Sequence, residues 1–263
     1  MSTDGLLVGA HVDRRDPLRE AHSRAADIVQ IFLSDPQSWK KPERRADAEE
    51  LRHQTLPLYV HAPYLINVVA EASRIRIPSR RILSETCEAA VEVGAAAVVV
   101  HGGHITGEGP LTDAYSRWRK ALLELDTEIP VLIENTAGGD NAVCRRVESI
   151  ARLWEVIGDL GAGFVLDTCH AWAGGEPGEE LVGRVLEATG RIDLVHCNDS
   201  RDPFDSRRDR HANLGQGKMP TELLAEVVAL AAAPVIVETP GDAVEHRADM
   251  DFVRRAANRA PAA

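Results

Sequence analysis

The chain has 263 residues and a formal net charge of −11, and it contains no apolar run near the roughly 18 residues that a membrane span requires. The acidic balance argues against a protein that holds nucleic acid by positive charge spread over its whole surface. The first residues show no basic segment followed by an apolar one, so we expect no signal peptide and a cytoplasmic location. Scattered cysteines without a C-x-x-C pair argue against a disulfide framework and favour small buried side chains at Cys87, Cys144, Cys169 and Cys197.

Short apolar runs alternate with helical stretches along the sequence. The runs predict buried strands of a parallel sheet at Leu6–Ala10, Val29–Leu33, Leu58–Val60, Val98–Val100, Val131–Ile133, Phe164–Leu166, Ile192–Val195 and Val235–Val237. The helical pattern is clearest at Arg80–Val93, Ala114–Leu125, Val147–Ile157, Leu181–Ala188 and Thr221–Leu230. Eight such units in 263 residues indicate the α/β class and predict a single (β/α)8 TIM barrel domain over residues 1–263. An open doubly wound sheet is less favoured, because no G-x-G-x-x-G motif follows the first run.

Each of the last six runs is followed by a residue that can bind a metal: His61, His101, Glu134, Asp167, His196 and Glu238. In a barrel the C-terminal ends of the strands meet at one mouth, where active sites lie. A single histidine at a strand end is more often a structural, hydrogen-bonded residue. Several carboxylates gathered at one buried mouth, however, would repel one another unless cations neutralised them. The pattern therefore predicts a metal site at the mouth.

Three further candidates lie outside the strands. His170 follows Asp167 by about one helical turn, and the extended pair Asp209 and His211 would project to the same side. The complete set has five imidazoles and four carboxylates without a thiolate, which suits catalytic zinc, with manganese or iron as substitutes. With one shared carboxylate, these nine residues would serve about three ions.

Nine segments of the chain resemble the endonuclease IV family of AP endonucleases. They are Gly9–Val12, Gln30–Leu33, His61–Asn67, Val100–His104, Glu134–Gly138, Leu166–His170, His196–Ser200, Asp209–Gly215 and Glu238–Gly241. The match runs in order over nearly the whole chain and is most similar to the shorter actinobacterial members. Its D-T-C-H and D-R-H elements are quite specific.

The resemblance implies a DNA repair enzyme, a zinc-dependent endodeoxyribonuclease that cuts double-stranded DNA 5′ to abasic sites and leaves a 3′-hydroxyl and a 5′-deoxyribose phosphate. It implies three zinc ions, held by His61, His101 and Glu134, by Glu134, Asp167, His196 and Glu238, and by His170, Asp209 and His211. Glu134 would be the catalytic bridge between two ions. We expect a monomer that acts in the cytoplasm, on the nucleoid.

The resemblance also implies residues that fill the gap when an abasic sugar is flipped out of the helix. Tyr64 matches the family's tyrosine, whereas Gln37 stands where the family has an arginine. Trp39 is expected either to compensate for that arginine or to belong to the core.

Other residues near the mouth are candidates for supporting roles. Arg207, Arg208 and Arg210 share a loop with Asp209 and are expected to reach DNA phosphates, against the alternative of a solvated surface loop. His11 and His104 are expected to hydrogen-bond metal ligands rather than to bind a metal themselves.

Two other functions fit part of this pattern. A metal-dependent sugar isomerase or epimerase on a related barrel also presents acidic residues and histidines at its strand ends, but it needs only one or two ions. His170, Asp209 and His211 would add the third site and favour the nuclease. A non-catalytic metal-binding or DNA-binding barrel is the third hypothesis, which the complete ligand set disfavours.

Overall fold

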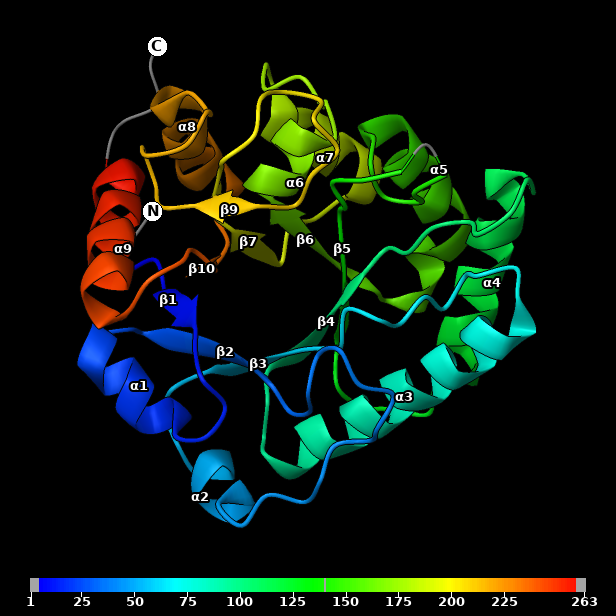
Figure 1. Cartoon of the computed structure of the whole chain (residues 1–263), viewed down its shortest axis with the longest axis horizontal. Helices are drawn as coiled ribbons and strands as arrows, with labels where there is room; N and C mark the ends of the chain where they lie inside the picture. Colours follow the sequence, from blue (N-terminus) through cyan, green and yellow to red (C-terminus); the bar gives the residue numbers. More distant parts are fainter. Residues whose placement is uncertain (1–4, 140, 259–263) are drawn as a thin grey trace.

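The computed structural model describes residues 5–139 and 141–258. Its central strands are parallel and close into a barrel in the order β1-β10-β7-β6-β5-β4-β3-β2 (Figure 1). They are β1 (Val8–His11), β2 (Ile28–Phe32), β3 (Leu58–His61), β4 (Ala97–His101), β5 (Val131–Glu134), β6 (Gly163–Asp167), β7 (Leu194–His196) and β10 (Val235–Val237). This closed ring of strands confirms the predicted TIM barrel.

Helices surround the barrel (Figure 1). They are α1 (Pro17–Arg24), α2 (Ala48–Arg52), α3 (Ser73–Glu92), α4 (Leu111–Glu124), α5 (Val147–Ile157), α6 (Thr168–Ala173), α7 (Leu181–Thr189), α8 (Thr221–Ala231) and α9 (Ala243–Ala257), with a short 3-10 turn at Gly158–Leu160. In the loop after β7, β8 (Asp199–Ser200) pairs antiparallel with β9 (His211–Ala212). Within the described part of the chain, none of the helices is long and apolar enough to cross a membrane.

All eight predicted strands form, each within two residues of its predicted ends. The predicted helix Arg80–Val93 is wrong at its start, because α3 begins at Ser73 and continues through Pro78. Its first turns are anchored by tertiary contact: the hydroxyl of buried Ser79 accepts a hydrogen bond from Asn67 N at 2.8 Å. Such packing outweighs the local cost of a proline in a helix.

Side chains alternate between the inner and outer faces of each strand. A small buried cluster fills the inside of the barrel, separate from the larger cluster between strands and helices, and consists of Ile28, Tyr59, Ala97, Val99, Leu132, Val165, Leu194 and Ile236. A step of two residues leads from Tyr59 to His61 and from Leu132 to Glu134, and the other four predicted strand-end ligands follow cluster residues in the same way. The strand period therefore turns these side chains into the mouth.

Gly9 provides a test of the strand packing. A Cβ at this position would lie 1.8 Å from the carbonyl oxygen of Ile28 on β2, and backbone cannot move aside easily. We predict that Gly9→Ala lowers the free energy of unfolding by roughly 3 kcal/mol or more, measured by urea denaturation. Gly183→Ala in α7 is the control: its Cβ meets no atom within 4 Å, so the helix should gain roughly 0.5–1 kcal/mol. A Gly9→Ala protein as stable as wild type would contradict this strand contact.

Candidate metal centre

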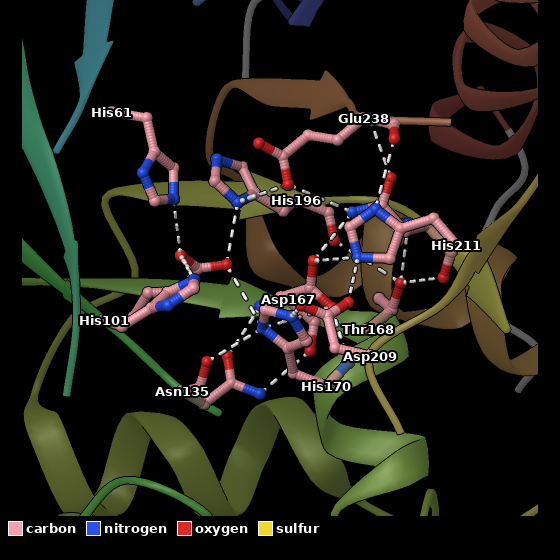
Figure 2. Close-up of polar contacts among 12 residues, drawn as sticks. His61, His101, Asn135, Asp167, Thr168, His170, His196, Asp209, His211 and Glu238 are labelled. Carbon is pink, nitrogen blue, oxygen red and sulfur yellow. Dashed lines mark hydrogen bonds and ion pairs between the residues drawn. The ribbon is translucent and has the colours of Figure 1, made fainter. Parts of the chain in front are cut away.

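The barrel mouth gathers the predicted ligands from several elements (Figure 2). Strands β3 to β7 end on His61, His101, Glu134, Asp167 and His196, and Glu238 directly follows β10. The other three lie on α6, on the loop after β8 and on β9: His170, Asp209 and His211. Each of the nine belongs to a group of side chains whose ligand atoms lie within 4.8 Å of one another. The structure therefore brings the predicted residues together, and their role as ligands stays a prediction.

Glu134 lies at the centre of the arrangement and is completely buried. Its Oε2 lies 3.1 Å from His61 Nε2 and 3.2 Å from His101 Nε2. Its Oε1 lies 3.0 Å from His196 Nδ1. The two oxygens of one carboxylate thus face two different groups of imidazoles, which is the geometry that a bridging ligand needs.

The other two groups adjoin the first. His196 Nδ1 lies 3.3 Å from Glu238 Oε2, and Asp167 completes that group. Asp209 presents one oxygen to each remaining imidazole, at 3.1 Å from His170 Nε2 and 3.0 Å from His211 Nε2. Asp209 and His211 therefore do project to the same side, as the sequence predicted.

These separations fit zinc. Ligand atoms about 2.0–2.1 Å from a tetrahedral ion lie roughly 3.3 Å from one another, and the nitrogen–oxygen distances around Glu134 and Asp209 are 3.0 to 3.3 Å. In addition, Nε2 of His211 is buried and has no hydrogen-bond partner among the described residues. A buried imidazole nitrogen that faces carboxylates without a hydrogen bond is what a metal ligand requires.

Without a cation, protons balance the buried carboxylates. Burial by itself lowers the pKa of His196, but the charges of Glu238 and Glu134 outweigh it and raise the pKa to about 9. Burial likewise lowers the pKa of His211, while Asp209 and Asp167 raise it to about 9. Burial would raise the pKa of Glu134, yet His196 and other imidazoles hold it well below its usual range. The buried carboxylates at the mouth are thus neutralised either by protons on the histidines or by bound cations.

Main-chain carbonyls fix the rings of three histidines. Nδ1 of His61 lies 2.7 Å from Ala62 O, Nδ1 of His170 lies 3.0 Å from Asn135 O, and Nδ1 of His211 lies 3.1 Å from the carbonyl oxygen of Glu238. A carbonyl only accepts, so in the neutral ring the proton sits on Nδ1 and Nε2 keeps a lone pair. All three direct that Nε2 towards the carboxylates.

Sequence reasoning missed the buried amides that hold the predicted ligands. Asn135 donates to Asp167 O at 2.9 Å and accepts from Asp167 N at 2.7 Å. Asn198 donates to Asp167 Oδ2 at 2.7 Å and accepts from Glu238 N at 2.7 Å. The available signal was position, because both asparagines stand within two residues of a strand end that carries a predicted ligand.

The four cysteines are buried and form no disulfide, as predicted. Cys169 also groups with Asp209 and His211 in the arrangement that could hold an ion. Burial, together with the charge of Asp167, raises the pKa of its thiol to about 12. Without a bound cation this thiol is therefore protonated.

A cavity of about 240 Å³ opens beside this cluster. His101, His170 and Asp209 line this cavity, together with Tyr64 and Arg207. Tyr64 is 51% exposed, so it projects to solvent although its base packs against the cluster. Its ring centroid lies 5.8 Å from that of His101 in a stacked arrangement.

The other residues predicted to contact DNA fall into two groups, arginines that form ion pairs and exposed loop residues. Arg210 donates to Asp202 Oδ2 at 2.7 Å, and Arg208 lies 3.7 Å from the same carboxylate, so the folded loop binds both arginines. Gln37 and Trp39 are exposed on the loop after β2. Trp39 is 42% exposed, which makes the core alternative for this residue wrong.

The two supporting histidines also differ. His11 Nδ1 lies 3.4 Å from Glu238 Oε1, which is the expected place behind a ligand. His104 is exposed on the rim of the cavity, where its carbonyl accepts a hydrogen bond from Asn67. No hydrogen bond or ion pair between His104 and a predicted ligand is found among the described residues, although His104 lines the same cavity as His101 and His170.

Comparison with known proteins shows to which family the chain belongs. Over residues 18–256 the chain matches the family described as the xylose isomerase-like TIM barrel. It is 57% identical over 249 residues to a probable endonuclease 4 of Mycobacterium leprae, which covers 95% of this chain and 98% of that protein. The chain belongs to the endonuclease IV family. A second endonuclease 4, from Mycobacterium marinum, is 54% identical and covers 96% of this chain and all 100% of that protein.

A solved structure agrees with the endonuclease IV assignment. Endonuclease IV from Thermus thermophilus aligns with a TM-score of 0.82 at 31% identity, over 95% of this chain and 98% of that one. A D-tagatose 3-epimerase-like protein aligns with a TM-score of 0.76 at 20% identity, over 96% and 98% of the two chains. At that identity the epimerase-like protein shares the fold alone.

Zinc uptake should release protons. The pKa values of about 9 mean that His196 and His211 are protonated near neutral pH, whereas a metal binds only the neutral imidazole. We expect at least about two protons to leave on zinc binding at pH 7, and the affinity to rise as the pH increases. Calorimetry in two buffers with different heats of ionisation measures this release. Calcium, which prefers oxygen ligands, is the control. Zinc uptake without proton release would contradict the prediction that His196 and His211 bind the metal.

Proposed function

We propose that this chain is a DNA repair endonuclease that uses three zinc ions to hydrolyse the phosphodiester 5′ to abasic sites, leaving a 3′-hydroxyl and a 5′-deoxyribose phosphate. Two observations in a chain of this family carry the proposal: two adjoining ligand groups share Glu134, and Asp209 lies 3.1 Å from His170 Nε2 and 3.0 Å from His211 Nε2. Sugar isomerases of related fold need only one or two ions, so the group around Asp209 favours the nuclease.

Zinc, when bound, would lower the pKa of a coordinated water and neutralise charge on a phosphate. The residues of the chain determine where the ions would be held. Glu134 is buried and directs one oxygen to His61 and His101 and the other to His196, so its rigid carboxylate sets the spacing of two sites. Asp209, by contrast, is 48% exposed, which leaves the third group on the side that substrate would approach.

The cavity beside the cluster suits a sugar that has lost its base. Its volume of about 240 Å³ is small, and a base-bearing nucleotide would have to compete with Tyr64 for the space. Phe32 and His61 pack edge-on against the Tyr64 ring, at centroid distances of 4.9 and 5.5 Å. The ring is therefore held upright at the rim, where it would fill the gap left by the flipped sugar.

An acidic chain needs a local positive surface to bind DNA. One cavity of about 660 Å³ between the loops after β1 and β2 is lined by Arg14, Arg15, Lys40, Lys41, Arg44 and Arg45, together with the acidic Asp35, Glu43 and Asp47. Arg45 is paired with Asp47 at 2.7 Å. Arg14, Lys40, Lys41 and Arg44 form no ion pair with the residues that the structure describes. We call this cavity the basic groove.

The basic groove leads towards the metal centre. A second cavity, of about 400 Å³, shares Arg14 and Arg15 with the groove and extends to Phe32. The Phe32 ring lies 5.3 Å from that of His61. A DNA strand with its lesion at the cluster would thus place flanking phosphates over unpaired cations. This arrangement answers the objection raised by the net charge.

Nicking of a duplex with one abasic analogue tests the proposal. We expect zinc-loaded protein to cut 5′ to the lesion and to spare an undamaged duplex. Glu134→Gln should lower the rate more than roughly 100-fold, because it removes the charge shared by two groups. Glu226→Gln, an exposed position on α8, is the control and should cut normally. A metal-replete protein that cannot nick, but acts on a free ketose, would favour the isomerase.

Two double variants test the basic groove. Lys40→Ala/Arg44→Ala should weaken binding to undamaged duplex and lower the slope of log Kd against log salt by about 0.9 for each lost phosphate contact. Arg152→Ala/Arg255→Ala removes the same charge from exposed sites on α5 and α9 and should leave the slope nearly unchanged. Equal effects of the two variants would show that only net charge matters.

A further inference from the structure

Gln30 is a fully buried polar residue inside the barrel. It lies on β2 between Ile28, which belongs to the inner apolar cluster, and Phe32 at the mouth. The strand period places its side chain on the inner face, beside His11 of the neighbouring strand. A buried amide must satisfy its donors and its acceptor within the protein. Its partners therefore reveal its role.

The amide of Gln30 joins two predicted ligands of one group. Its Nε2 donates to Glu238 Oε1 at 2.7 Å and also lies 3.0 Å from His11 Nδ1. Its Oε1 lies 3.0 Å from His196 Nε2. The same two ligands approach each other at 3.3 Å on the far side of the imidazole, between His196 Nδ1 and Glu238 Oε2.

Counting protons decides which nitrogen of His196 faces the cluster. The carboxylate of Glu238 accepts hydrogen bonds, so the NH2 of Gln30 must be the end that faces it. The oxygen of Gln30 then faces His196, and an oxygen there requires a proton on Nε2. In the neutral ring Nδ1 is left with its lone pair. That nitrogen points at Glu134, 3.0 Å away.

His196 differs in this respect from the other histidines. His61, His170 and His211 place Nδ1 on main-chain carbonyls and turn Nε2 to the cluster. A main-chain carbonyl remains whatever side chain its residue carries. Among the described residues of the cluster, His196 is the one whose ring is oriented by a side chain. Its binding nitrogen therefore depends on the identity of residue 30.

We propose that Gln30 is a positioning residue for the ion that His196 and Glu238 would share: it selects the Nε2-protonated form of His196 and holds the carboxylate of Glu238. This inference rests on the proposed zinc function. Glutamine suits the task because it offers a donor to one ligand and an acceptor to the other. A glutamate would keep only the acceptor, and a methionine of similar length would keep neither.

The test compares Gln30→Met, Gln30→Glu and wild type. We measure bound zinc by chelator competition, and the tautomer of His196 in zinc-free protein by long-range nitrogen–proton NMR, at an alkaline pH where the ring is neutral. Gln30→Met should lose roughly 10–100-fold in affinity for one ion of the set, and His196 should no longer be held Nε2-protonated. Gln30→Glu should keep the Nε2-protonated signal, because the acceptor remains. Thermal unfolding checks that both variants fold.

Asn67→Leu is the matched control, since it removes a buried amide whose hydrogen bonds go to His104 and to the main chain of Val69 rather than to a predicted ligand. It should keep the full zinc content and the wild-type His196 signal. Wild-type affinity and an unchanged tautomer in Gln30→Met would overturn the role of Gln30, as would equal zinc loss in Asn67→Leu. A wild-type chain that takes up no zinc would instead overturn the proposed function, and the role of Gln30 with it.

Discussion

The mouth of this barrel depends on one carboxylate that has no access to water. Glu134 remains charged because imidazole nitrogens lie 3.0 to 3.2 Å from its two oxygens. An isolated charge at this depth would cost several kilocalories per mole. The rings of His61, His170 and His211 are held in turn by main-chain carbonyls, and the ring of His196 is held by the amide of Gln30, so that each of these four rings presents one nitrogen to the cluster. Cations and protons are therefore alternative ways to satisfy the same set of buried charges, and this competition links metal binding to pH.

The predicted ligands on the loop can be as well placed as those on the strands, because the loop has a buried anchor. Asp249 of α9 accepts hydrogen bonds from Leu214 N at 2.9 Å and from Thr239 Oγ1 at 2.6 Å. Leu214 lies just beyond His211, and Thr239 directly follows Glu238. One carboxylate on an outer helix thus ties the loop of the third group to the strand end of the second. Such support keeps a site within the small tolerances that catalysis requires.

The net charge of the chain does not show where its acidic and basic residues lie. The sum is −11, yet a group of acidic residues is used at the mouth, where cations would neutralise them, while unpaired basic residues line the groove between the loops after β1 and β2. Since salt screens charges beyond about 10 Å, a bound polyanion responds to the groove and the metal centre more than to the distant surface. Net charge is therefore a weak guide to the partner of this protein.

The sequence by itself determined which side chains face the mouth. A strand has a period of two and a parallel barrel collects its strand ends, so His61 and Glu134 could be placed without knowledge of any distant contact. Tertiary structure alone decided how those side chains are held. Gln30 meets Glu238 and His196 across 208 and 166 residues, and Arg210 is paired with Asp202 in the folded loop. The period of a strand can be recognised from neighbouring residues alone. Which nitrogen of a histidine faces the cluster, and which residue an arginine pairs with, depend on groups that only folding brings together.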